Sequence, residues 1–123
     1  MRPEHIPGVV RLLGAGIHTS MPAELPAALR DRLAIVAGAT PDAVAAVQRL
    51  AKWCRSVTFI KPTRTRVAAL RGLTNVTIVH GAEIVCVDGI EHLESVVVRE
   101  IRSGVISART AAALFLLQDR GTE

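Results

Sequence analysis

The sequence predicts an α/β fold in which a parallel sheet is followed by a three-stranded antiparallel meander. Residues 31–54, DRLAIVAGATPDAVAAVQRLAKWC, indicate an aliphatic strand, a glycine turn and an amphipathic helix. Two more aliphatic strands follow within residues 57–80, as in consecutive βαβ units. Beyond residue 83 the pattern changes to short strands joined at Asp88-Gly89 and Ser103-Gly104, which favour tight turns.

A chain of 123 residues is the length of one domain. Half of its residues are hydrophobic and 2% are aromatic, which is typical of aliphatic parallel strands covered on both faces. Prolines and glycines are frequent in the first thirty residues, so we expect an irregular lead-in there, with an extended piece and one or two helical turns. The expected boundaries are 1–30 for the lead-in (extended at 15–20, helical at 23–30), 31–118 for the α/β domain, about 83–110 for the meander, and 119–123 for a polar tail.

The helix after the glycine turn has a well-marked start. Thr40 stands at the N-cap position, Pro41 follows as the first helical residue, and Asp42 lies in the first turn. The helix is predicted to run from Pro41 to about Cys54. Its apolar face is expected to comprise Val44, Val47, Leu50, Ala51 and Cys54.

The remaining elements follow from β-branched runs and turn residues. The segment SVVV at 95–98 is also a candidate sheet edge. The predicted strands are Val57–Lys61, Val76–His80, Glu83–Val87, Leu93–Ile101, Val105–Arg109 and Ala113–Leu117, with a short helix at Thr65–Leu73 that stops at Gly72.

Charge is distributed unevenly along a chain whose net charge is +4. No acidic residue lies between Asp42 and Glu83, so one end of the molecule is expected to be basic and to attract phosphates. Nucleic acid is not favoured as the partner, because stacking aromatics and a recognisable reading motif are missing. The basic residues of this stretch are Arg49, Lys52, Arg55, Lys61, Arg64, Arg66 and Arg71.

Other classes of site find little support in the sequence. Cys54 and Cys86 are far apart and are expected to be small buried apolar residues. The four histidines lack the spacing of metal ligands, and no catalytic triad can be assembled, so we expect neither a metal nor a catalytic residue. No apolar run is long enough for a membrane span and no secretory leader is evident, which predicts a cytoplasmic protein.

In this order, the elements resemble the NADPH-binding domain of the low-molecular-weight thioredoxin reductases, within the pyridine nucleotide-disulfide oxidoreductase superfamily. The segment LAIVAGATPDAVAAVQRLAKWCRSVTFI matches that domain's first strand, glycine turn, helix and second strand. LTNVTIVHGAEIVCVDG is similar to its third strand and the entry to its meander, and AALFLLQ to its last strand. The resemblance implies a Rossmann-like βαβαβ unit with a three-stranded meander, and NADPH as the ligand.

Two departures from the family bear on catalysis. The family carries a CxxC redox pair just upstream of its first strand, where this chain has HTSMPAE without a cysteine. The family also has FAD-binding segments on both sides of this domain, which the present chain does not contain. We therefore expect no FAD site in this chain and no turnover by the chain alone, because a bound nicotinamide would have no acceptor for its hydride.

The glycine turn keeps part of a dinucleotide-binding fingerprint. Gly38 satisfies the first glycine position and Ala43 the small third position, but Thr40 replaces the second glycine, where backbone would approach the pyrophosphate. The Thr40 hydroxyl could cap the helix or donate to a phosphate, and both alternatives stay open. The candidate phosphate contacts at this turn are Gly38, Ala39, Thr40, Pro41 and Asp42.

The second strand ends in KPTRTRV, residues 61–67, where the family's HRRxxxR segment binds the 2′-phosphate of NADPH. Lys61 keeps its basic character, Arg64 and Arg66 are displaced arginines, and no carboxylate is present for the ribose of NAD. These arginines could hold NADPH, hold another phosphate-rich ligand such as a cyclic dinucleotide, or simply be solvated. His80, at the end of the third strand, is the histidine expected to face the ligand.

Three functions remain open from the sequence. The first is a non-catalytic nucleotide-binding module that senses or regulates, and the second is an NADPH-delivering component or fragment of a flavin-dependent reductase with a flavoprotein partner. The third is a protein-interaction scaffold without a ligand. A homodimer is compatible with each of them, and the nucleotide-binding module is the interpretation that the sequence favours.

Overall fold

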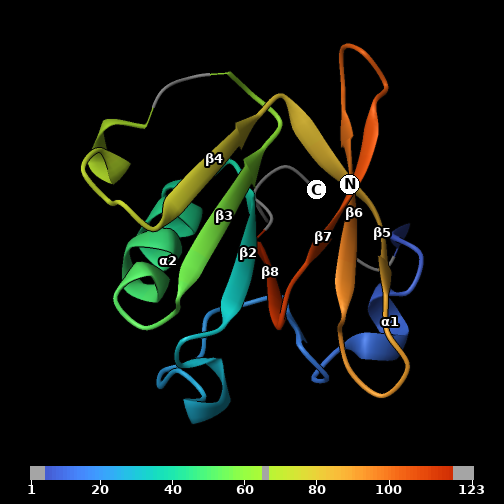
Figure 1. Ribbon diagram of the computed structural model, residues 1–123, viewed down its shortest axis with the longest axis horizontal. Helices are drawn as coiled ribbons and strands as arrows, with labels where there is room; N and C mark the ends of the chain where they lie inside the picture. Colours follow the sequence, from blue (N-terminus) through green and yellow to red (C-terminus); the bar gives the residue numbers. More distant parts are fainter. Residues whose placement is uncertain (1–4, 65–66, 118–123) are drawn as a thin grey trace.

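The computed structural model describes residues 5–64 and 67–117, and it contains two sheets packed face to face (Figure 1). The first sheet is parallel throughout and has the strand order β1-β8-β2-β3-β4. The second is antiparallel, in the order β5-β6-β7. The strands are β1 (Ile17–His18), β2 (Leu33–Gly38), β3 (Ser56–Lys61), β4 (Val76–His80), β5 (Ala82–Asp88), β6 (Ser95–Glu100), β7 (Ile106–Thr110) and β8 (Ala113–Leu117).

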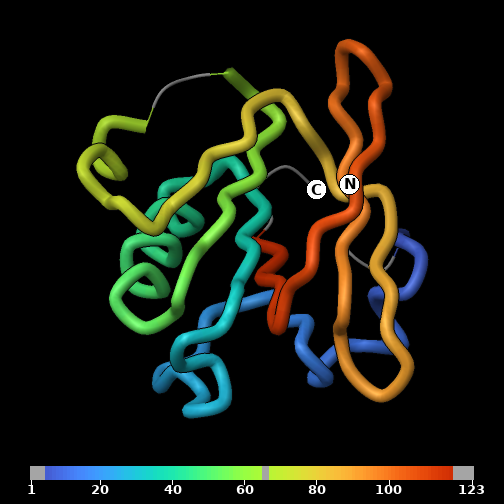
Figure 2. Tube along the Cα trace, viewed as in Figure 1, coloured from blue at the N-terminus to red at the C-terminus, as the bar shows by residue number. Residues whose placement is uncertain are grey.

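Helix α2 (Pro41–Ala51) covers one face of the parallel sheet, and the antiparallel sheet covers the other. The described residues also contain three shorter helical elements: α1 (Val9–Leu12) and the 3-10 turns η2 (Ala27–Leu29) and η3 (Ala68–Leu70). Figure 2 shows how the chain leaves β4, crosses to the antiparallel sheet and returns to the parallel sheet only at β8. This is the predicted combination of a βαβ unit and a meander, so the predicted fold class is confirmed.

The central strands are buried on both faces, which explains their continuous aliphatic sequence. Along β2, Ala34 and Val36 pack toward α2, whereas Ile35 and Ala37 pack toward the antiparallel sheet. The α2 side is filled by large side chains such as Phe59 and Phe115, both almost completely buried. Two cores therefore share one sheet, and the parallel strands are fixed from both sides.

The structure corrects several local predictions. The helix predicted at Thr65–Leu73 is only the 3-10 turn η3; residues 65 and 66 are outside the described part of the chain. No side chain caps η3, and Gly72 has a φ of +89° just after it. Helix α2 ends at Ala51, three residues early, where the Asn75 amide donates to the Ala51 carbonyl at 2.8 Å.

The lead-in is more ordered than its composition indicates. It contributes α1 and the two-residue strand β1, and its apolar side chains enter the core beneath the antiparallel sheet. The segment SVVV, predicted as a sheet edge, lies in β6, which is the central strand of its sheet. Cys54 is buried as predicted, but Cys86 is only half-buried. The core residues of the lead-in are Ile6, Val9, Leu12 and Ile17.

Within the described residues, no helix is long and apolar enough to cross a membrane.

Candidate functional site

The predicted site residues meet at the carboxyl edge of the parallel sheet. Gly38, Lys61 and His80 are the last residues of β2, β3 and β4. Lys61 is directly paired with His80 in the β3–β4 ladder, and the β2–β3 register runs through Ala37 and Ile60 just before Gly38 and Lys61. In open α/β sheets ligands bind outside this edge, so the topology collects these residues where a ligand would lie.

Gly38 is required by the close approach of two elements. A Cβ atom at this position would lie 2.4 Å from the Leu117 carbonyl oxygen of β8 and 3.2 Å from the Cβ of Ala43 in α2. Both distances are shorter than an ordinary contact. The glycine and the small Ala43 therefore allow strand and helix to pack closely; the sequence assigned this packing role to Ala43 and the tight turn to Gly38.

Thr40 caps α2, as predicted for helix initiation. Its backbone is extended, and its hydroxyl oxygen accepts a hydrogen bond from the Ala43 N–H at 3.3 Å. The Thr40 carbonyl accepts from Ala43 and Val44 at 3.0 and 3.4 Å. Pro41 has no N–H to offer. Several helix-end donors are therefore already satisfied or missing without any ligand.

Asp42 adds a negative charge to the same helix end. It is exposed in the first turn of α2, where a carboxylate interacts favourably with the helix dipole. The same carboxylate repels a phosphate that approaches this end. The start of α2 is thus well suited to stabilise the helix and less suited to bind a pyrophosphate.

The end of β3 has the opposite character. Lys61 is 4% exposed and is the only buried charged residue among those described. Burial lowers the pKa of the Lys61 ammonium below its usual value. Three residues later, Arg64 returns over the sheet edge: its Nε lies 3.3 Å from where a Cβ of Gly81 would be.

Gly81 connects the segment that follows β3, residues 62–64, to both sheets. It has a φ of +63°, and its N–H donates to the Thr63 carbonyl at 3.3 Å. Its own carbonyl accepts from Ile101 N–H at 2.9 Å, at the start of the β6–β7 turn. The Gly81–Thr63 bond holds the residue before Arg64 next to the end of β4, because Gly81 directly follows His80 in the chain. In the described structure, the buried Nδ1 atom of His80 has no hydrogen-bond partner.

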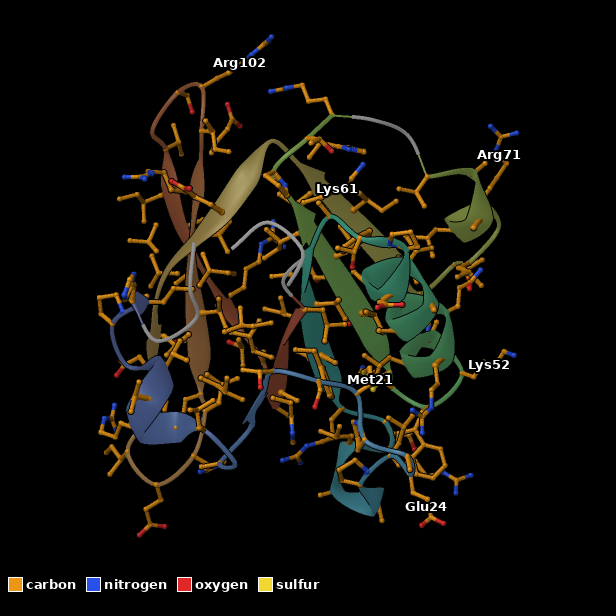
Figure 3. The ribbon with its side chains drawn as sticks, turned by 180° about the vertical axis from the view of Figure 1, so that it is seen from behind. Met21, Glu24, Lys52, Lys61, Arg71 and Arg102 are labelled. Carbon is orange, nitrogen blue, oxygen red and sulfur yellow. The ribbon has the colours of Figure 1, made fainter. Side chains whose placement is uncertain are left out.

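The basic residues do not form the single basic end that the sequence predicted. Figure 3 shows Lys61 and Arg102 in the half of the molecule that holds the carboxyl edge, whereas Lys52 lies at the opposite end of α2. Arg49 is occupied structurally, since its guanidinium donates to the carbonyls of Pro22 and Ala23. The basic residues between Asp42 and Glu83 are therefore distributed over both ends of the molecule, because α2 runs antiparallel to the strands.

Arg102 is a basic residue on the same side of the molecule that the sequence prediction did not consider. The Ile101–Gly81 hydrogen bond brings the β6–β7 turn to the carboxyl edge. No local pattern could have indicated this, because the bond joins residues far apart in the sequence. The predicted contact Arg66 lies outside the described residues.

Other polar side chains are placed away from this edge or packed into the fold. His18 stacks on Phe115 with ring centroids 4.8 Å apart, and burial lowers the pKa of its imidazole. Trp53 packs against the α2 core and donates to the Pro26 carbonyl at 3.1 Å. In the described part of the chain, no group of three His, Cys, Asp or Glu side chains could hold a metal ion.

Comparison with known proteins defines the fold. No family model matches the chain, and no curated protein matches its sequence. Among solved structures, the thioredoxin reductase of Lactococcus lactis superposes with a TM-score of 0.83 at 16% identity, over 97% of this chain and 41% of that one. The fold is that of a thioredoxin reductase domain.

Two further reductases give the same result. The enzyme of Gloeobacter violaceus matches with a TM-score of 0.77 at 24% identity, over 92% of this chain and 36% of its own. The thioredoxin reductase of Giardia duodenalis matches with a TM-score of 0.81 at 17% identity, over 93% of this chain and 39% of its own. The chain thus spans about two fifths of the length of the thioredoxin reductases that it matches. The likeness supports the thioredoxin-reductase-like α/β fold that the sequence predicted.

Proposed function

We propose that this domain is a nucleotide-binding module that holds a phosphate of NADPH, or of another phosphate-rich nucleotide, at the ends of β3 and β4. The observation that carries the proposal is the placement of Arg64 over Gly81, next to Lys61 and His80, which are paired at the ends of β3 and β4. A guanidinium and an ammonium here can hold a phosphate by charge-assisted hydrogen bonds. In dinucleotide-binding folds, an arginine near the end of the second strand accommodates the 2′-phosphate of NADP.

Each residue has a distinct part in this proposal. Arg64 is exposed and free to fold over a phosphate, with Gly81 giving it room because no side chain stands beneath it. Lys61 supplies a buried positive charge below the ligand. At the neighbouring strand, Gly38 lets β8 and α2 pack closely, while Asp42 disfavours a phosphate at the helix itself.

The module is proposed to bind a nucleotide without catalysing a reaction of it. In this proposal the protein is a cytoplasmic pseudoenzyme. NADPH supplies hydride chemistry only where an acceptor such as a flavin or a disulfide is within reach. In this chain, HTSMPAE stands where the reductases' dithiol would be expected, and no thiol pair is available there.

Isothermal titration at low salt with NADPH, NADH, ATP and a cyclic dinucleotide tests the proposal. We expect NADPH to bind and NADH to bind at least tenfold more weakly, because only NADPH carries the 2′-phosphate. Lys61→Met, which keeps the length of the side chain but removes its charge, should weaken NADPH binding. Lys52→Met makes the same change at the far end of α2 and should leave binding unaltered.

Absence of binding by all four nucleotides would overturn the proposal and favour a scaffold without a ligand. Binding of another nucleotide in place of NADPH would keep the module but change its ligand. Equal affinity for NADPH and NADH would exclude recognition of the 2′-phosphate.

A second candidate function is the NADPH-delivering part of a flavin-dependent reductase. The observation in its favour is that nearly the whole length of this chain matches part of the thioredoxin reductases. This candidate predicts NADPH-dependent reduction of FAD when a separate flavoprotein is added. If NADPH binds but no hydride reaches the flavoprotein, the binding module is the better description.

A further inference from the structure

Strand β7 forms an open edge of the antiparallel sheet. Within residues 5–64 and 67–117 it pairs only with β6, and four of its five residues are exposed. Two consecutive apolar side chains are exposed at its start, Val105 at 64% and Ile106 at 59%. In Figure 1 the β6–β7 hairpin projects beyond the rest of the molecule.

The hydrogen bonds on either side of β7 show which backbone groups face outward. Glu100 N–H donates to the Val105 carbonyl at 2.9 Å, and Ala111 N–H donates to the Glu94 carbonyl at 3.1 Å. Since antiparallel bonding alternates along a strand, residues 107 and 109 face β6 as well. The N–H and C=O groups of residues 106, 108 and 110 therefore point away from β6, toward the open edge.

The opposite edge of this sheet is covered, unlike β7. Val87 of β5 donates its N–H to the Pro7 carbonyl at 3.1 Å. A Cβ on Gly8 would lie 2.6 Å from the Val87 carbonyl oxygen, so the lead-in runs closely along this strand. Natural proteins usually protect sheet edges in this way, which makes the bare edge at β7 a candidate interface.

Arg109 supplies a second, independent observation on the same strand. It is paired with Val96, whose side chain is fully buried, so Arg109 projects toward the inner face of the sheet. Its Nε atom is buried, and within the described structure it has no hydrogen-bond partner. Ser107 projects to the same face two residues earlier, opposite the buried Val98. A buried guanidinium nitrogen without an acceptor indicates that a partner is missing.

We propose that β7 pairs with β7 of a second copy of this chain, antiparallel about a two-fold axis at Ala108. In this register residue 108 faces residue 108 of the other copy, and residue 106 faces residue 110. All three outward-facing N–H and C=O pairs of each strand are then satisfied, and the two antiparallel sheets become one continuous sheet.

The side chains of β7 are complementary in this register. Ala108 faces its own copy, and two methyl groups fit where larger side chains would be crowded. Ile106 lies beside Thr110 of the second copy, a pairing of β-branched residues. Arg109 lies beside Ser107 of the second copy, whose hydroxyl can accept from the unpartnered guanidinium, and no two like charges are directly opposite.

A charge-swap experiment tests the two-fold register. The wild-type chain should be dimeric in sedimentation equilibrium, and Ala108→Lys and Ala108→Glu should each be monomeric because like charges would face each other. An equimolar mixture of the two variants should recover the dimer. Ala108 is exposed, so thermal unfolding should show that both variants fold. A monomeric wild-type chain, or dimeric single variants, would overturn the proposal.

Disulfide trapping is an independent measurement of the same axis. Paired Cα atoms in such a ladder are about 5.5 Å apart, within reach of a disulfide. Ala108→Cys should therefore form a covalent dimer under mild oxidation. Thr110→Cys is the matched control, since its two copies would be about 14 Å apart at 3.4 Å per residue. Equal cross-linking of the two variants, or none in Ala108→Cys, would contradict the register.

Discussion

The carboxyl ends of β2 and β3 lie side by side, yet they are built for different tasks. At β2 the sequence resembles a phosphate-binding turn, but Thr40 caps the helix and Asp42 places a negative charge there. At β3 the sequence departs from the reductase motif, yet Lys61 and Arg64 keep positive charge at the sheet edge. The comparison teaches that a glycine fingerprint can be kept for packing. We propose that the phosphate binds at the neighbouring strand end instead.

The largest effect is expected for the packing role of Gly38. Gly38→Ala places a methyl group against the Leu117 carbonyl and should lower the free energy of unfolding by about 3 kcal/mol. Urea denaturation measures this, with Ala39→Ser at the exposed next residue as the control. A variant as stable as the wild type would show that the close approach is not required.

The next effect concerns ligand affinity at β3. Arg64→Ala should weaken NADPH binding by about 1.5 to 3 kcal/mol, the usual contribution of a hydrogen bond to a charged group. Arg71→Ala removes an equally exposed arginine beyond η3 and should leave affinity unchanged. Titration calorimetry compares the two, and equal losses would indicate a general charge effect instead of a site.

Substitutions of Thr40 test the glycine turn after β2 independently of the end of β3. Thr40→Ala should lower the free energy of unfolding by about 1 kcal/mol through loss of the cap, whereas Thr40→Ser keeps the hydroxyl and should be neutral. Neither change should alter NADPH affinity. If Thr40→Gly tightens NADPH binding instead, the turn at β2 is the pyrophosphate site and the comparison fails.

The smallest effect is a pH dependence of stability at His18. Burial lowers its pKa in the folded state, so the unfolded chain binds its proton more readily. Stability from this group is present above the ordinary histidine pKa and is lost as the pH falls through the lowered value. Urea midpoints at about pH 7.5 and about pH 5.5 should therefore differ less in His18→Phe, which keeps the stacking on Phe115, than in the wild type.

Much of the fold could be predicted because its signals are local. Aliphatic runs, the Thr40-Pro41 helix start and the turns at Gly89 and Gly104 are each decided by a few adjacent residues. Predicted strands agree with the structure to within one or two residues in most cases. The helix predicted at 65–73 is reduced to a 3-10 turn, and among the described residues 67–73 only Leu70 is fully buried to hold the segment in place.

The site could be predicted only in part, because its geometry depends on distant contacts. The sequence places Gly38, Lys61 and His80 at strand ends, and parallel pairing brings them together. It does not reveal that Ile101 bonds to Gly81, which brings the start of the β6–β7 turn next to the end of β4. It also does not reveal which meander strand is the open edge, since sheet order depends on long-range pairing and not on local pattern.

Backbone amide chemical shifts during an NADPH titration test the central claim most directly. We predict that the largest changes occur at the β3 and β4 ends, at Thr63, Arg64 and Gly81, with small changes at Ala39 and Ala43 in the glycine turn. Changes centred on the glycine turn would place the phosphates at the start of α2 and contradict the account. A spectrum unchanged at saturating NADPH would contradict it as well, because no nucleotide would then bind at this edge.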